Sequence, residues 1–291
     1  MKKITMLLLP LLFSMFIFIN PAEAGDVDNA LNFNGTVIDQ RVQTSEPIPY
    51  TISYTVMAWV KTDLQVKVLT WAEAGIGNSV DIEVYNGNFR CRATKEKAVP
   101  NTVTSTIPIG DGTWHHVAAT KNAGTISVYV DGVFEASLAG FADNIIPIYS
   151  TMGAGYINNH WQGNKSGTLD ELSVWSTALT ESEIAAYMAS GLVGTEANLI
   201  AYYNFDNPAV TPGGDNTTVT GNVILVNNAV PPGKAPEDYD GTLTLFSLNG
   251  ATGNWVEGYA PPPTPLSDWA IYMGVFLIAT FILLRYRRRV A

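Results

Sequence analysis

Acidic and histidine residues whose spacing could support catalysis are few in this 291-residue chain. His115 and His116 are neighbours in a predicted strand, so their side chains point to opposite faces and cannot bind one ion together. Asp170 and Glu171 are adjacent as well, and therefore do not form the facing pair of carboxylates that glycoside hydrolysis needs. No nucleophile motif is present. The residue pattern therefore predicts a protein that is not an enzyme.

One segment has the residue types of a sugar-binding surface. The run from Tyr156 to Lys165 combines aromatic side chains with amides. Sugar rings stack on aromatic rings through their apolar faces, while amide groups bind their hydroxyls. We therefore predict that this loop contacts a ligand through Tyr156, Asn158, Asn159, His160 and Trp161.

From Ala30 to Asp206, the chain alternates short runs of β-branched and aromatic residues with residues typical of turns. These runs are predicted to be the strands that position the candidate residues. Strands at such spacing without intervening helices predict an all-β sandwich. The pair Asp131-Gly132 predicts a tight hairpin. One helix is predicted, because Thr180 and Glu183 have the spacing of a capping box and Gly191 can end the helix.

Five motifs in order resemble those of the laminin-G-like, concanavalin A-like jelly roll found in secreted bacterial proteins. They are Ala30–Gly35, Met57–Lys61, Asp111–Ala118, Val128–Gly132 and Gly167–Trp175. The resemblance implies a β-sandwich jelly-roll domain over residues 25–206. It also implies that binding, to a glycan or to a protein, is the expected work of the domain.

The same resemblance bears on calcium and on hydrolysis. Relatives of this fold often hold one ion where the first and last long strands meet, which implies Asn34 and Asp170 as calcium ligands, with Asp39 or Glu171 as helpers. Many relatives have Asp where this chain has Asn34, so a turn or ladder role for Asp170 is the alternative. Family-16 glycoside hydrolases carry Glu-x-Asp-x-x-Glu on one strand; the nearest stretch here, Asp81–Tyr85, reverses the order and lacks the third acid.

The region after the jelly roll is divided by composition. Residues 207–240 are rich in Pro, Gly and Asn and are predicted to form a long loop or linker. Residues 241–258 resemble an accessory strand segment that would join the same body, with a truncated second domain as the alternative. A proline-rich spacer covers residues 259–264.

Both ends of the chain have the pattern of targeting segments. Residues 1–24 have the basic, apolar and small-x-small parts of a signal peptide. Residues 265–291 contain a short apolar run, predicted to be a transmembrane helix, followed by an arginine cluster that would stay in the cytoplasm before processing. This tail resembles exosortase and IPTL-type sorting signals, with the motif Pro265, Leu266, Ser267, Asp268 and Trp269.

The resemblance of the tail implies a sorting protease of exosortase type as a partner, and the membrane as a second one through the C-terminal helix. A plain single-pass anchor is the alternative. The predicted location is the cell envelope, the cell surface or the medium, with the N-terminus outside.

Charge excludes one class of partner. The chain has 16 basic and 26 acidic residues, and a formal net charge of −10. Such a surface makes nucleic acid an unsuitable partner. We expect an exported binding module for a glycan or a surface protein, acting in adhesion or matrix assembly. A structural matrix component without a discrete ligand is the alternative, and a polysaccharide hydrolase is disfavoured.

Overall fold

The computed structural model describes residues 28–73, 78–94, 101–141, 145–157, 160–162 and 166–260. The predicted signal peptide, the sorting motif Pro265–Trp269, the predicted transmembrane helix and the loop residues Asn158 and Asn159 lie outside these ranges. Within them, no helix combines the length and the apolar character needed to cross a membrane.

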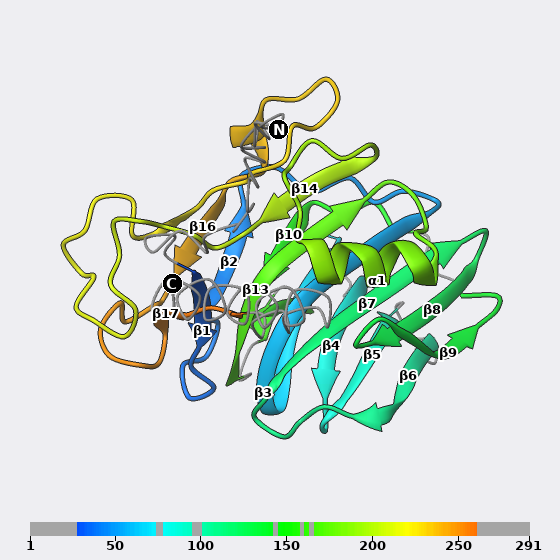
Figure 1. Ribbon diagram of the computed structural model, residues 1–291, viewed down its shortest axis with the longest axis horizontal. Helices are drawn as coiled ribbons and strands as arrows, with labels where there is room; N and C mark the ends of the chain where they lie inside the picture. Colours follow the sequence, from blue (N-terminus) through cyan, green and yellow to red (C-terminus); the bar gives the residue numbers. More distant parts are fainter. Residues whose placement is uncertain are drawn as a thin grey trace, which may run out of the picture. The chain divides into compact units, whose positions relative to one another are not determined.

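Two antiparallel sheets form the body of the protein (Figure 1). The first sheet follows the order β17-β1-β13-β3-β7-β8-β9, and β14 pairs with the second half of β13. Its strands are β1 (Asn29–Phe33), β3 (Tyr54–Ala72), β7 (Trp114–Asn122), β8 (Thr125–Val130), β9 (Val133–Leu138), β13 (Ser166–Trp175), β14 (Leu199–Tyr203) and β17 (Asn254–Glu257).

The second sheet follows the order β15-β16-β2-β10-β3-β4-β5-β6. Its other strands are β2 (Arg41–Thr44), β4 (Ser79–Tyr85), β5 (Asn88–Thr94), β6 (Asn101–Pro108), β10 (Tyr149–Met152), β15 (Ile224–Leu225) and β16 (Gly241–Thr244). A short two-stranded hairpin, β11 (Gly155–Ile157) and β12 (His160–Gln162), lies outside both sheets.

The 19-residue strand β3 belongs to both sheets. Its residues 54–61 pair with β7, whereas residues 66–72 pair with β4. The inner face of each sheet carries apolar side chains at alternate positions, such as Val56 and Val60 on β3 and Val80 and Ile82 on β4, and these are buried in one core. Alternation of this kind buries one face of a strand, so the predicted all-β sandwich is confirmed.

The one α-helix among the described residues, α1 (Glu181–Ser190), covers the outer face of the first sheet (Figure 1). Ile184 of α1 packs with Met57, Ala118 and Trp175 in a second, smaller apolar cluster. Thr180 is the N-cap, and Thr180 and Glu183 form the reciprocal capping box, while Gly191 follows the helix with a φ of 68°. The predicted helix and its two boundaries are therefore confirmed.

The strands after residue 206 pair within the same two sheets. β16 pairs with β2 and β17 pairs with β1, and the compact unit runs to Gly258. Residues 207–240 consist mostly of turns, but they also contain β15 and the short 3-10 helix η1 (Pro236–Tyr239). The segment predicted as an accessory strand thus lies in the sandwich itself, because β17 places Trp255 in the core.

Candidate functional site

The β11–β12 hairpin places the predicted aromatic residues side by side. Tyr156 and Trp161 are directly opposed across the hairpin, with ring centroids 4.7 Å apart. Tyr149 of β10 completes a cluster of three rings, since its centroid lies 5.0 Å from Tyr156 and 5.3 Å from Trp161. All three rings are half-buried, so each keeps part of its surface available to solvent.

A guanidinium group completes this aromatic cluster. Arg41 of β2 lies over the Trp161 ring, with its Cζ atom 4.1 Å from the ring centroid. Arg41 donates hydrogen bonds to the Asp39 carbonyl oxygen (3.1 Å) and to Gln43 Oε1 (3.4 Å). Burial lowers the pKa of Arg41, and the Asp39 charge opposes this shift. The cation therefore stacks on Trp161 from one side and fixes the orientation of its ring.

Of the five predicted ligand residues, the structure places three. Tyr156 and Trp161 belong to the aromatic cluster, and His160 is exposed beside it. The rings meet edge to face or tilted, and the surface that each residue leaves exposed is suited to the apolar face of a sugar. We name this set, Tyr149, Tyr156, Trp161 and Arg41, the aromatic site.

A second group of polar side chains lies where β1, β13 and the segment after β14 meet. Asp28 hydrogen bonds to Asp170, whose side chain is fully buried. Burial, followed by the Asp206 charge, raises the pKa of Asp28 to about 6. Burial also raises the pKa of Glu171 to about 7, with the charges of Asp206 and Asp28 adding to the effect and a hydrogen bond from Tyr202 opposing it.

The structure does not bring Asn34 to Asp170. Phe33 lies opposite Gly167 in the β1–β13 ladder, so Asn34 follows at the Ser166 end, whereas Asp170 lies one position beyond the Leu31–Leu169 pair. This separates them by about 13 Å along the strands. Asn34 Oδ1 instead accepts hydrogen bonds from the Thr36 N–H (2.9 Å) and hydroxyl (2.8 Å).

In the ranges that the structure covers, the acids around Asp170 included, no group of three or more His, Cys, Asp or Glu side chains has an arrangement that could hold a metal ion. His116 is buried, and burial lowers its pKa to about 4. His115 Nδ1 lies 2.9 Å from Asp131 Oδ2 instead.

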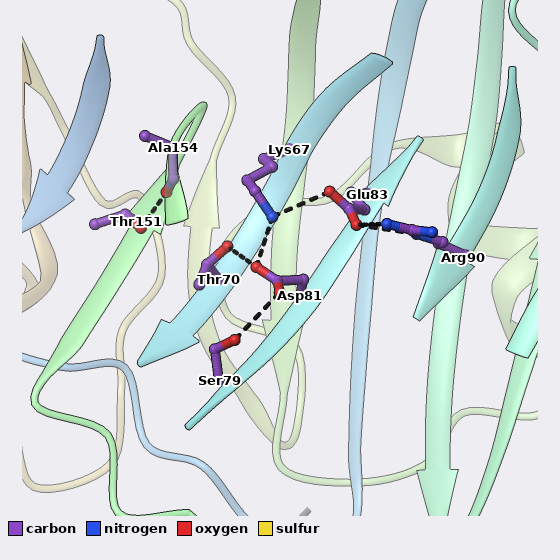
Figure 2. A network of polar contacts seen from close by, with 8 residues as sticks. All are labelled: Lys67, Thr70, Ser79, Asp81, Glu83, Arg90, Thr151 and Ala154. Carbon is purple, nitrogen blue, oxygen red and sulfur yellow. Dashed lines mark hydrogen bonds and ion pairs between the residues drawn. The ribbon is translucent and has the colours of Figure 1, made fainter. Parts of the chain in front are cut away.

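The two acids of the Asp81–Tyr85 stretch are buried in ion pairs (Figure 2). Asp81 contacts Lys67 at 2.6 Å, and Glu83 contacts Arg90 at 2.6 Å. Their side chains keep only 1% and 3% of their surface exposed. A polysaccharide therefore has no access to them in this conformation.

A row of side chains on the outer face of the first sheet forms another possible ligand surface. Asn32, Thr168, Lys61 and Trp114 are directly opposed in turn on β1, β13, β3 and β7. Together with Glu257 they line a pocket of about 400 Å³. Trp114 is half-buried there, so the pocket combines an indole ring with polar groups of both charges.

Sequence reasoning missed Tyr149 and Arg41 of the aromatic site, and Asp28 and Asp206 beside Asp170. Each belongs to a different strand or loop from its partner, so no local spacing indicates the contact. The alternating pattern of β2 could have shown that Arg41 and Gln43 share a face, but not that this face meets Trp161.

Comparison with known proteins shows the family of the fold. A laminin-G-type family model described as the concanavalin A-like lectin/glucanases superfamily matches residues 34–185. No curated protein matches the chain. Among solved structures, a putative carbohydrate-binding protein from Bacteroides ovatus is similar, with 17% identity and a TM-score of 0.52 over 82% of this chain, which spans 62% of that structure.

Two further structures are similar at lower TM-scores. A heptameric SAP-like pentraxin from Limulus polyphemus has 18% identity and a TM-score of 0.46, over 55% of this chain and 82% of that one. Domain 4 of an arabinanase from Geobacillus stearothermophilus, solved with arabinotriose, has 22% identity and a TM-score of 0.43, over 54% of this chain and 75% of that one. The family model matches just over half of the residues, and the strands form the two sheets of a sandwich. The chain therefore belongs to the concanavalin A-like lectin/glucanase superfamily.

Proposed function

We propose that the protein is a carbohydrate-binding module and that the aromatic site is where it binds. The observation that carries the proposal is the surface cluster of Tyr149, Tyr156 and Trp161, with the Arg41 guanidinium 4.1 Å from the Trp161 centroid. Half-buried rings offer apolar surface to a sugar ring, and a guanidinium donates hydrogen bonds to its hydroxyls. Membership of a lectin and glucanase superfamily supports binding to glycans or to surface proteins.

A glycan array tests this proposal, because it separates a lectin from a matrix component without a ligand. We expect the wild-type protein to bind at least one glycan class, and Trp161→Ala to bind it at least tenfold more weakly, equivalent to about 1.4 kcal/mol. Phe134, an exposed aromatic residue on β9, provides a control, since Phe134→Ala removes a ring without touching the aromatic site. A flat array for the wild-type protein would remove the lectin proposal.

The pocket beside Trp114 is the rival location for the same function. Trp114→Ala should leave the affinity unchanged if the aromatic site binds the glycan. A loss of binding in Trp114→Ala, with Trp161→Ala unaffected, would move the proposed site to the outer face of the first sheet. Circular dichroism of each variant checks that both substitutions leave the fold intact.

We propose Asp28 and Asp170, in place of Asn34, as ligands for the calcium ion that the family resemblance implies. Carboxylate oxygens are the ligands that Ca²⁺ prefers, and the two carboxyl groups lie within hydrogen-bond reach of each other, which supports the proposal. We expect calcium to raise the melting temperature of the wild-type protein and to have a smaller effect on Asp170→Asn. Equal melting temperatures with and without calcium in the wild-type protein would contradict the proposal.

We also propose that the protein is exported, is not a hydrolase and is processed at its C-terminal tail by a sorting protease. The support is the signal-like residues 1–24 and the sorting-like residues 265–291. The mass of the protein recovered from outside the cell tests both ends at once. A mass that includes residues 1–24 or the whole tail would contradict the corresponding processing step, and turnover of any polysaccharide would contradict the absence of hydrolase activity.

A further inference from the structure

The second sheet holds an amine and two carboxyl groups together (Figure 2). Their neighbours along the strands, such as Val66 and Ile82, are buried in the core, so the polar groups lie on the opposite face of the sheet. Lys67 of β3 places its Nζ atom 2.6 Å from Asp81 Oδ1 and 3.0 Å from Glu83 Oε2, both on β4. The three side chains keep only 7%, 1% and 3% of their surface exposed. This is the set of groups that amide formation requires: an amine, an acyl carbon and a carboxylate that can carry protons.

Backbone from the β11–β12 hairpin closes this group against solvent. A Cβ atom added at Gly155 would lie 3.2 Å from both Asp81 Oδ1 and Lys67 Cε, so the glycine lets the hairpin backbone approach closely. Enclosure holds the reacting atoms in contact and excludes the water that would reverse a condensation.

We propose that Lys67 and Asp81 condense to an intramolecular amide bond, with Glu83 carrying the protons. Glu83 takes a proton from the Lys67 ammonium, and the free amine attacks Cγ of Asp81, which forms the N–C bond. The C–O bond to one Asp81 oxygen then breaks. Glu83 passes this first proton, and a second one that the nitrogen loses after the attack, to that oxygen, so one water is released and no oxidant or other reactant is needed.

Neighbouring hydroxyl groups are placed to assist the attack. Thr70 Oγ1 donates a hydrogen bond to Asp81 Oδ1 (2.8 Å), and Ser79 Oγ donates one to Oδ2 (3.2 Å). Donors on both oxygens stabilise the negative charge that grows on them when the amine adds to the carbon.

Charge balance favours the product. Burial alone raises the pKa of Asp81, but the Lys67 charge and its hydrogen bonds outweigh burial, so the pKa is lowered and the starting state is an ion pair. Condensation removes both buried charges and their desolvation penalty. Glu83 remains neutralised, because Arg90 Nε (2.9 Å) and Nη2 (2.6 Å) both donate to its Oε1.

Tryptic digestion of the full-length protein, followed by peptide mass measurement, tests the proposal. In a chain without the bond, trypsin cleaves after Lys67 and gives residues 62–67 and 68–90 as separate peptides. An amidated Lys67 is not cleaved, so we expect one looped peptide, residues 62–90, lighter than its linear sequence by one water. Recovery of only the two separate peptides, from fresh protein and after prolonged incubation, overturns the proposal.

One further outcome and two variants sharpen the test. Loss of water with cleavage still occurring after Lys67 indicates dehydration of Asp81 alone, which also overturns the proposal. Lys67→Arg keeps the positive charge but lacks a nucleophilic amine, so it should give no dehydrated peptide. Glu83→Gln should form the looped peptide about 100-fold more slowly; an unchanged rate would overturn the role of Glu83.

Discussion

At the scale of single residues, the acids around Asp170 differ from those around Lys67. Asp81 and Glu83 have cationic partners at hydrogen-bond distance, whereas Asp28 and Glu171 lie near other carboxyl groups. The pKa of Asp28 is about 6 and that of Glu171 about 7, above the values of about 3.9 and 4.3 in an unfolded chain. The folded protein therefore binds protons at these sites more tightly than the unfolded chain does.

This difference predicts how stability changes with pH. The protonated Asp28 and Glu171 side chains add to the free energy of unfolding, and this contribution is fully present below about pH 4. It is lost as the pH rises to about 7, because the unfolded chain releases these protons at a lower pH than the folded protein does. We expect Asp28→Asn to reduce the loss of unfolding free energy between these pH values, measured by urea denaturation at a series of pH values in the absence of calcium.

Glu237→Gln provides the control for that measurement. It makes the equivalent change from carboxyl to amide at an exposed position in η1, so its pH profile should follow that of the wild-type protein. A profile for Asp28→Asn that also matches the wild type would contradict the shift at Asp28.

At the scale of elements, the turn between β10 and β11 determines where the aromatic hairpin lies. Gly153 occupies this turn with a φ of 82°, and a Cβ atom there would lie 2.3 Å from two ring atoms of the buried Phe33. The Gly153 N–H also donates to the Lys67 carbonyl oxygen. A side chain at residue 153 would thus disturb both the core and the hairpin.

A comparison of two glycines tests this role. Gly153→Ala should lower the unfolding free energy by about 2–4 kcal/mol, since it adds overpacking to backbone strain. Gly124, in the turn between β7 and β8, has a similar φ of 83° but no atom within 4 Å of an added Cβ. Gly124→Ala should therefore cost only about 1 kcal/mol. If urea denaturation gives the same loss of unfolding free energy for both variants, the Phe33 ring moves aside without strain and the prediction is wrong.

At the scale of the whole molecule, the sandwich depends on strands at both ends of the described sequence. β17 pairs with β1 at the edge of the first sheet, and β16 pairs with β2 in the second. Trp255 of β17 and Leu243 of β16 are buried in the core. Residues 207–258 therefore complete the core that the family-matched residues begin.

Truncation tests this dependence. We expect residues 25–258 to unfold cooperatively on heating, as followed by circular dichroism, and residues 25–206 to show no cooperative transition. Removing the second segment takes one of the two neighbouring strands from β1 and from β2, which leaves each of them as an unprotected edge strand. It also exposes apolar core surface, including the site that Trp255 fills. The same melting temperature for both lengths would mean that residues 25–206 fold as an independent domain.

Local signals let the sequence by itself determine much of this protein. Alternating apolar residues decide which face of a strand is buried, the Thr180–Glu183 spacing decides where α1 begins, and five ordered motifs indicate the family. Tyr156 and Trp161 could be assigned to one candidate ligand loop because they lie a few residues apart in the chain, and the structure then pairs them across a hairpin. Each of these features depends on residues close together in the chain.

Only the tertiary structure decided which distant residues meet. Arg41 lies on Trp161, and Asp28 hydrogen bonds to Asp170, because folding brings segments that are far apart in the sequence side by side. Strand pairing also separates Asn34 from Asp170. The β1–β13 register, which the sequence of neither strand encodes alone, places Asn34 beside Ser166 at the start of β13 and not beside Asp170. Register and sheet order depend on the packing of the whole core, so the sites built across strands became visible only there.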